Sequence, residues 1–420
     1  MRKVLPLIAA LLLILSTFAQ AADYQLREVV VLSRHNIRAP LSRNGSVLSK
    51  VTPHKWFEWT AAPSELSLRG GELETLMGQY FRKYLVSQGL ITENYLPLDG
   101  EVRFYSNTRQ RTIATAQYFS SGMFPVANVR IEHQADTSKM DPVFHPKLTI
   151  VNDKFRAEAT RQINVMGGSE GLKGINDSLA ENYALLEKVL DFDKSQMHLE
   201  NGVQHFIANS IEPVFELNEE PSLTGVSSLK LANQAADALI LQYYEEPDAK
   251  KAAFGKKLNL AQWTAIARIK DVYGDVLFAA PIVAVNVANP LLKVMSNELA
   301  LDGRKFTFLC GHDSNIASVL SALGAEYYSL PNSIEKKTPI GSKFVIEKWR
   351  GSDGREYAKL KLVYQSTKQL RERTMLNLDT PPEIYALSLR GLEKNADGYY
   401  RLDDVQKRFS EAIDAYERLK

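Results

Sequence analysis

Short apolar runs that stop abruptly at polar residues predict the buried strands of this chain. Leu26–Ser33 (LREVVVLS) is rich in β-branched residues and ends immediately before Arg34. Lys305–Gly311 (KFTFLCG) has the same character and ends before His312, and Val102–Tyr105 is a shorter run of the same kind. Runs of this length and composition are typical of strands that are covered on both faces of a sheet.

Segments with helical periodicity follow these strands. Apolar residues recur on one face of Leu66–Leu85, which predicts an amphipathic helix that packs against the sheet. Thr108–Phe119 and Ser314–Leu323 are predicted as further helices, and Ser342–Trp349 with Arg355–Tyr364 is predicted as a hairpin. The alternation of strands and helices at both ends of the chain predicts an α/β fold.

The middle of the chain has a different pattern. Ser178–Leu190 and Ser227–Tyr244 show helical periodicity without strand signals. We therefore expect a three-layer α/β/α domain formed by residues 22–145 and 262–420, with a mainly helical cap domain (146–261) inserted between its two halves.

The first residues have the three-part layout of a secretory signal peptide. Arg2 and Lys3 give a basic start, Val4–Leu15 is an apolar run of 12 residues, and residues 19–21 (AQA) fit a cleavage site. A membrane-spanning helix needs about 20 apolar residues, which argues against an uncleaved anchor. We expect residues 1–21 to be removed and the mature chain to have no stable association with a membrane.

Charge and cysteine content narrow the function classes. The chain has 51 Lys and Arg against 49 Asp and Glu, and two of the basic residues lie in the predicted signal peptide. The mature chain is therefore formally neutral, which argues against a nucleic-acid partner but leaves room for a local cationic pocket. Cys310 is the sole cysteine, so no intramolecular disulfide can form, and its place in an apolar run predicts a buried, inert thiol.

The polar residues that follow the two buried strands carry the candidate chemistry. Residues 34–40 (RHNIRAP) follow the first strand, and residues 311–315 (GHDSN) follow the later one. Ligands of open α/β sheets bind beyond the carboxyl ends of the strands. We therefore expect the two motifs to meet in one crevice.

The first motif places a histidine between two arginines. The guanidinium groups of Arg34 and Arg38 have paired donors that match phosphate oxygens. Burial and neighbouring cations lower the pKa of an imidazole, so His35 is expected to stay neutral and to keep the lone pair that a nucleophile needs. The motif predicts phosphoryl transfer to His35, although taken alone it also fits an ordinary surface loop.

The second motif would complete such a site. Phosphoryl transfer to His35 leaves an alkoxide that needs a proton, and Asp313 in its acid form can provide it. The alternative role for Asp313 is the N-cap of the following helix, which is common for Asp, and the two roles can coexist.

Together the two motifs resemble the signatures of the histidine acid phosphatases, a branch of the histidine phosphatase superfamily. Four further stretches add to the likeness, which runs from about Tyr24 to the C-terminus: residues 39–48 (APLSRNGSVL), 241–245 (LQYYE), 312–318 (HDSNIAS) and 338–341 (TPIG). The resemblance implies a phosphoglycerate-mutase-like α/β/α domain with a helical domain over the crevice, a periplasmic location and a phosphomonoester as substrate. Secreted members of the family usually carry several disulfides, and this chain departs from them.

The resemblance also implies roles by motif position. His35 matches the nucleophile that becomes phosphohistidine, and Asp313 matches the proton donor. Arg34, Arg38 and His312 match ligands of the phosphate group.

Two further residues are assigned less directly by the resemblance. Another phosphate arginine is expected at the start of the helix after the second strand, where Arg111 is the match and Arg109 is the rival. Glu245 matches a family acid that narrows the pocket from the helical side, and its alternative is a solvated surface carboxylate. The remaining histidines show no metal-ligand spacing and no Gly-rich phosphate loop is present, so we expect neither a metal nor another cofactor.

Alternatives remain open for the substrate and for the function class. The resemblance favours a hexose 1-phosphate, and Tyr243, Tyr244 and residues 338–341 agree with it, but inositol polyphosphates (phytate) would undergo the same chemistry. A sugar-phosphate-binding protein without catalysis would be free to lose His35 or Asp313, and both are present. An intracellular mutase is disfavoured by the predicted signal peptide.

Overall fold

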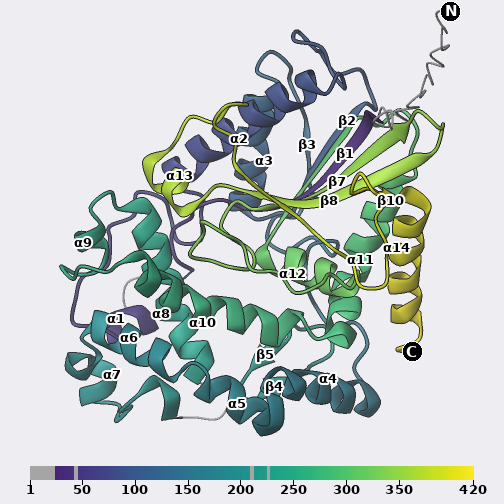
Figure 1. Ribbon diagram of the computed structural model, residues 1–420. Helices are drawn as coiled ribbons and strands as arrows, with labels where there is room; N and C mark the ends of the chain where they lie inside the picture. The colour runs from purple at the N-terminus through teal and green to yellow at the C-terminus, as the bar shows by residue number, and fades with distance from the viewer. Residues whose placement is uncertain (1–23, 42–45, 209–211, 225–227) are drawn as a thin grey trace, which may run out of the picture.

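The computed structural model describes residues 24–41, 46–208, 212–224 and 228–420, and the predicted signal peptide lies outside them. A mixed sheet runs through the upper part of the molecule in Figure 1, in the order β10-β8-β7-β1-β6-β2-β3, with β9 beside β8. Its strands are β1 (Tyr24–Arg34), β2 (Val102–Ser106), β3 (Ile131–Glu132), β6 (Phe306–Gly311), β7 (Lys343–Gly351), β8 (Glu356–Tyr364), β9 (Glu383–Ala386) and β10 (Tyr400–Arg401). The arrangement confirms the predicted α/β class.

Strand β1 lies in the middle of this sheet because its apolar run can be covered on both faces. Val29, Val30, Val31 and Leu32 are all fully buried. On one side β1 pairs in parallel with β6, and on the other it pairs antiparallel with β7. Strands β7 and β8 form the predicted hairpin, with its turn around Gly354. Every residue of β6 is also buried, including Cys310, as predicted.

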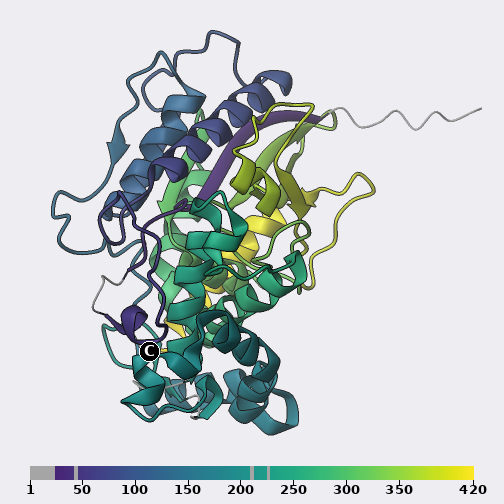
Figure 2. The ribbon, with the colours of Figure 1, turned by 90° about the vertical axis from the view of Figure 1, so that its left-hand side faces the viewer.

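Helices cover both faces of the sheet (Figures 1 and 2). The helices are α2 (Leu68–Ser87) and α3 (Gln110–Met123) on one face, and α11 (Pro281–Leu299), α12 (Asp313–Ala322) and α14 (Leu402–Glu417) on the other. The predicted amphipathic face of α2 is confirmed, because Leu73, Met77 and Phe81 are buried on one side of the helix.

The middle of the chain forms a second group of helices below the sheet in Figure 1. Its elements are α4 (Asp153–Met166), α5 (Gly171–Asp177), α6 (Ala180–Leu190), α7 (Gln196–Leu199), α8 (Ser228–Glu245), α9 (Ala249–Ala252), α10 (Leu260–Phe278) and a small hairpin of β4 (Pro213–Val214) and β5 (Ser222–Leu223). The short helices α1 (Val47–Lys50) and α13 (Thr367–Glu372) pack against α8. The hairpin is a strand pair that the sequence pattern did not reveal.

The core of this helical group is continuous from α6 to α10. Trp263 of α10 stacks on Tyr243 of α8, with 3.9 Å between ring centroids. Helix α10 therefore packs with the helical group, whereas α11 begins in the core of that group at Val283 and Val287 and packs against the sheet from Ala288 onward. The predicted domain division at residues 146–261 remains a prediction.

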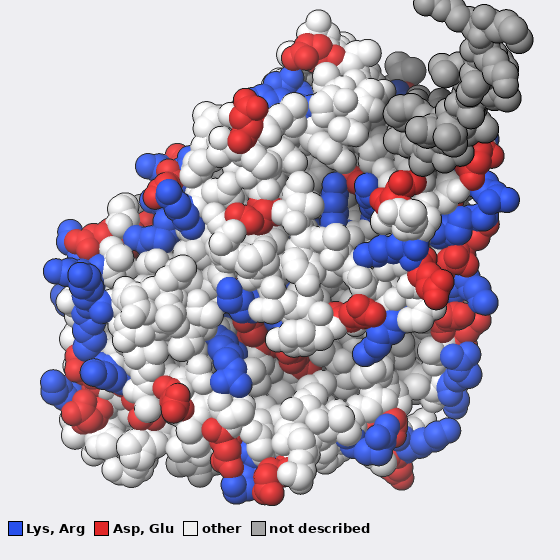
Figure 3. Space-filling view, viewed as in Figure 1, with Lys and Arg blue, Asp and Glu red and all other residues white. Residues whose placement is uncertain are grey.

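Surface composition is mixed on the face shown in Figure 3, where acidic and basic side chains are interspersed without a large area of one sign.

Among the described residues no single helix is long and apolar enough to cross a membrane. Helices α10 and α11 meet such a test only as a pair, and they are bent by 83° where they meet.

A buried ion pair joins α2 to the sheet directly beneath the first motif. Glu74 and Lys343 have fully buried side chains, and the Nζ of Lys343 lies 3.0 Å from Glu74 Oε2. The side-chain amide of Asn36 donates to Glu74 at 2.7 Å, and Lys343 also donates to the carbonyl of Gly341 at 2.8 Å. Because both charges are removed from water, each depends on the other.

The substitution Lys343→Met should lower the free energy of unfolding by about 3–5 kcal/mol. The reason is that Glu74 loses its cationic partner and must either stay charged in the interior or take up a proton. Urea unfolding of the mature protein measures this. Lys173→Met is the matched control: its pair with Asp177 is solvent-exposed, so its unfolding midpoint should stay at the wild-type value. A Lys343→Met protein as stable as the control would contradict the assignment.

Candidate active site

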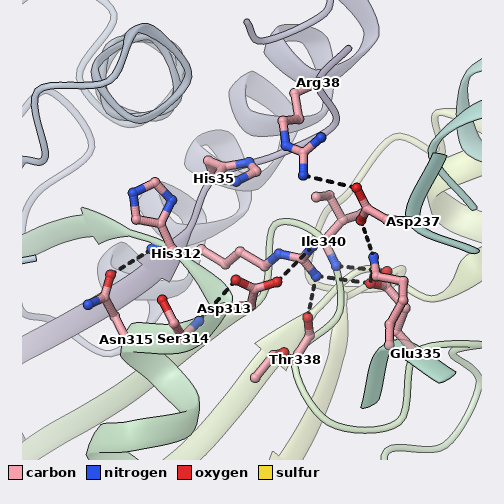
Figure 4. A network of polar contacts seen from close by, with 12 residues as sticks. His35, Arg38, Asp237, His312, Asp313, Ser314, Asn315, Glu335, Thr338 and Ile340 are labelled. Atoms are coloured by element: carbon pink, nitrogen blue, oxygen red, sulfur yellow. Dashed lines mark hydrogen bonds and ion pairs between the residues drawn. The ribbon is translucent and has the colours of Figure 1, made fainter. Parts of the chain in front are cut away.

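The parallel pairing of β1 with β6 brings the two motifs together. In this register Arg34 lies opposite Gly311, so the chain leaves both strands side by side. The backbone N–H of His35 donates to the carbonyl of Gly311 at 3.1 Å. The rings of His35 and His312 lie 5.5 Å apart between centroids (Figure 4). The structure therefore confirms the prediction that the two motifs meet at the carboxyl ends of the strands.

His35 keeps one free ring nitrogen. Its buried side chain lines a cavity, and its Nδ1 lies 2.9 Å from the backbone carbonyl of Asn36. Because a carbonyl oxygen only accepts, Nδ1 carries the proton and Nε2 keeps its lone pair. Burial, and next the charge of Arg111, holds the pKa of His35 well below its ordinary value of 6.5. Both effects favour the neutral imidazole, which keeps the lone pair on Nε2.

His312 has the opposite orientation. Its Nε2 lies 2.7 Å from the side-chain nitrogen of Asn107, whose oxygen already accepts from the backbone N–H of Thr108 and Asp141. The amide of Asn107 must then donate to Nε2, so Nδ1 of a neutral His312 carries a proton. Burial, and next Arg111, lowers the pKa of His312 well below 6.5. His312 is therefore a neutral hydrogen-bond donor at the cavity that it lines.

Three arginines line the same cavity: Arg34, Arg38 and Arg111. Three guanidinium groups at one cavity indicate a site for an anion, because arginine presents forked N–H donors that match the oxygens of a phosphate group. Burial, and next Arg38, lowers the pKa of Arg111 to about 10, which leaves it charged at neutral pH.

The buried carboxylate of Glu335 and the partly buried carboxylate of Asp237 hold two of these arginines in place (Figure 4). Arg34 donates to Glu335 at 2.9 Å, and Arg38 donates to Asp237 at 3.0 Å. Lys270 bridges the two carboxylates, at 2.8 Å from Asp237 and 3.0 Å from Glu335. These three residues were not among the predicted site residues, because a charged residue on an amphipathic helix or in a loop has the pattern of an ordinary solvated one.

Asp313 opens α12, and about half of its side chain (49 %) is exposed. Its carboxylate lies 3.3 Å from Arg34. Burial alone would raise the pKa of Asp313, but Arg34 and then Lys270 outweigh it and hold the pKa below its ordinary value. The carboxylate is therefore ionised before a ligand binds. Its expected alternative role as the N-cap is wrong, since His312 occupies that position and Asp313 is the first helical residue.

Of the two candidates for the further phosphate arginine, only one lines the cavity, and Glu245 lies outside the cavity. Arg111 lines the cavity, whereas Arg109 lies outside it and its guanidinium donates to the carbonyl of Ser138 at 3.3 Å. The carboxylate of Glu245 accepts from the hydroxyl of Ser67 at 2.8 Å, and Glu245 does not line the cavity. Glu245 lies at the end of α8, so helix packing directs it toward α2 instead.

The helical group closes the outer part of the cavity, whose volume is about 360 Å³. Asp271, Tyr273 and Asp275 of α10 line it, together with Glu220 beside the β4–β5 hairpin. Burial raises the pKa of Asp271 to about 7 and also raises that of Asp275. The cavity thus has a cationic inner end and an outer wall rich in carboxyl groups. Among the described residues no group of three or more His, Cys, Asp or Glu is placed to hold a metal ion.

Comparisons with known proteins agree with this geometry. The chain is 38 % identical to a glucose-1-phosphatase of Salmonella typhimurium, over 90 % of this chain and 91 % of that protein. It is 37 % identical to a glucose-1-phosphatase of Providencia rettgeri, over 94 % of this chain and 93 % of that protein. Among solved structures, the apo form of Hafnia alvei phytase superposes with a TM-score of 0.84 at 27 % identity, covering 94 % of this chain and 98 % of the other.

The family model of the histidine phosphatase superfamily (branch 2) matches residues 25–365. This range includes both strand-end motifs, the three arginines of the cavity and most of the helical group. The chain therefore belongs to branch 2 of the histidine phosphatase superfamily.

Proposed function

We propose that this protein hydrolyses phosphomonoesters through a phosphohistidine at Nε2 of His35, and that its preferred substrates are hexose 1-phosphates. The observation that carries the proposal is a neutral histidine with a free Nε2 that lines one cavity together with three arginines. An anion held by these arginines would lie beside the lone pair of His35. The family supports phosphomonoester hydrolysis as the reaction.

In the first step the phosphoryl oxygens accept hydrogen bonds from Arg34, Arg38, Arg111 and His312. Nε2 of His35 attacks phosphorus, and the bond from phosphorus to the sugar oxygen breaks as the P–N bond forms. The cations spread the negative charge of the transition state. The departing oxygen takes a proton from Asp313.

Asp313 must be protonated for this step, although it is ionised in the free protein. A bound phosphate adds negative charge beside Asp313. It also pairs with Arg34, the cation that lies 3.3 Å from Asp313, and so weakens the stabilisation of the Asp313 carboxylate by Arg34. Both changes raise the pKa of the carboxyl group. In the second step water attacks the phosphohistidine, Asp313 accepts the proton of that water, the P–N bond breaks, and inorganic phosphate leaves.

The outer wall of the cavity supports a sugar phosphate as substrate. Carboxyl groups such as Asp271, Asp275 and Glu220 can form hydrogen bonds with sugar hydroxyls. The identity to two glucose-1-phosphatases points the same way. Phytate is the second candidate, and the likeness to Hafnia alvei phytase supports it.

The leader-like residues 1–21 support export of the protein to the periplasm, and cell fractionation tests this.

The substitution His35→Ala should lower turnover by at least about 1,000-fold, because the nucleophile is lost while phosphate binding persists. Labelled substrate mixed with the wild-type protein and quenched in alkaline denaturant should leave label on His35, since the P–N bond survives alkali. Arg109→Ala is the control and should keep near-normal turnover, because Arg109 lies outside the cavity. Retained turnover in His35→Ala would refute the mechanism.

The substitution Asp313→Asn should separate substrates by their leaving groups. For glucose 1-phosphate, whose alkoxide needs a proton, kcat/KM should fall by about 100-fold or more. For p-nitrophenyl phosphate, whose phenolate leaves without a proton, the loss should be much smaller. Equal losses on both substrates would show that Asp313 is not the proton donor.

Parallel kinetics on glucose 1-phosphate and phytate test the choice of substrate. We expect kcat/KM for glucose 1-phosphate to exceed that for phytate by about tenfold or more, because the carboxyl groups of the outer wall match the hydroxyls of a sugar better than further phosphate groups. A preference for phytate would assign the protein to the second candidate activity without changing the roles of His35 and Asp313.

A further inference from the structure

Lys270 joins the two carboxylates that hold the phosphate arginines. Its Nζ lies 2.8 Å from Asp237 Oδ1 and 3.0 Å from Glu335 Oε1, and its side chain is 9 % exposed. Asp237 Oδ2 accepts from Arg38, while Glu335 Oε1 also accepts from Arg34. Figure 4 shows the line of contacts from Arg38 through Asp237 to Glu335. Each carboxylate is therefore shared between one arginine and the same lysine.

The three contact partners come from different parts of the chain. Lys270 belongs to α10 and Asp237 to α8, whereas Glu335 lies in the connection between α12 and β7. Glu335 is fixed further by the hydroxyl of Tyr244 at 3.1 Å and the backbone N–H of Ile340 at 3.1 Å. With its carboxylate held on several sides, Glu335 has little freedom to follow Arg34 if that side chain moves.

The charge of Lys270 also determines whether the inner end of the cavity has a net positive charge. Among the described side chains there, the cations are Arg34, Arg38, Arg111 and Lys270, and the carboxylates are Asp237, Asp313 and Glu335. With both histidines neutral, one positive charge is left over to attract an anion. Without Lys270 the formal sum is zero.

We propose that Lys270 is a positioning residue of the phosphate site, which orients Arg34 and Arg38 through their shared carboxylates and supplies the excess positive charge that binds the phosphate group. The inference rests on the proposed function, since it assigns the arginines to a phosphate group. Lys270 acts through Asp237 and Glu335, and none of the steps above requires it to touch the reacting atoms.

The charge of Lys270 also affects the pKa of Asp313, the proposed proton donor. The charged and titratable groups that act on Asp313 are Arg34, Lys270, Asp237, Arg111 and Tyr273. Lys270 lowers the pKa of Asp313, so its removal raises that pKa. In the complex with substrate Asp313 then stays protonated to higher pH, and the alkaline limb of kcat for glucose 1-phosphate moves upward in pH.

A role in stability alone makes a different prediction. If Lys270 only tied α10 to α8 and to the loop at Glu335, its loss would lower the unfolding temperature. Phosphate affinity and the position of the alkaline limb would then stay unchanged in the folded fraction. These two readouts therefore distinguish a positioning residue from an ordinary buried ion pair.

The test compares Lys270→Met with Lys270→Arg in the mature protein. Calorimetry with inorganic phosphate should give a dissociation constant about tenfold weaker for Lys270→Met, because a cation close to the anion is lost. The alkaline limb of kcat for glucose 1-phosphate should move to higher pH. Lys270→Arg keeps the charge, and both readouts should return toward wild-type values.

Lys336→Met is the matched control. Lys336 follows Glu335 directly, but its Nζ donates to the carbonyl of Leu330 at 3.1 Å and it does not line the cavity. This variant should bind phosphate as the wild type does. If Lys270→Met does not fold, Lys270→Gln replaces it, since the amide still donates to a carboxylate but carries no charge.

Phosphate affinity within about twofold of wild type, together with an unmoved alkaline limb, would overturn the inference even if the variant were less stable. That result would leave the proposed function untouched. Failure of the proposed function has its own signature, because the wild-type protein would then hydrolyse no phosphomonoester and leave no label on His35.

Discussion

Parallel hydrogen bonding between β1 and β6 sets Arg34 opposite Gly311, and the crevice is built from that register. The next residue of each chain is a histidine, so His35 and His312 leave the sheet side by side. A shift of one residue would turn one of the two imidazoles to the opposite face of the sheet. The buried pair of Glu74 and Lys343 supports the same loop from below through Asn36.

Charge is the second constraint on this crevice. Burial, and next the charges of the arginines, keep His35 neutral, and the arginines themselves need compensating charges. Glu335 and Asp237 supply these charges to Arg34 and Arg38. Asp313 is ionised in this setting, which makes its protonation dependent on the bound phosphate.

The helical group takes part in the chemistry as well as in substrate selection. Asp237 and Lys270 reach into the inner end of the cavity, while Asp271 and Asp275 form part of its outer wall. Helices α8 and α10 are held together by a buried core that includes the stacked pair of Trp263 and Tyr243. The positions of the phosphate arginines and of the outer wall therefore depend on the same helix packing.

The sequence by itself determined the strands and the residues directly after them, because a buried strand and the polar residue that ends it are neighbours in the chain. This is why Arg34, His35, Arg38, His312 and Asp313 could all be predicted, and the structure brings them together. The choice of Arg111 over Arg109, the exclusion of Glu245, and the network of Asp237, Lys270 and Glu335 were decided only by the tertiary structure. Those residues lie on helices or loops, where periodicity fixes which face a side chain occupies but not what packs against that face.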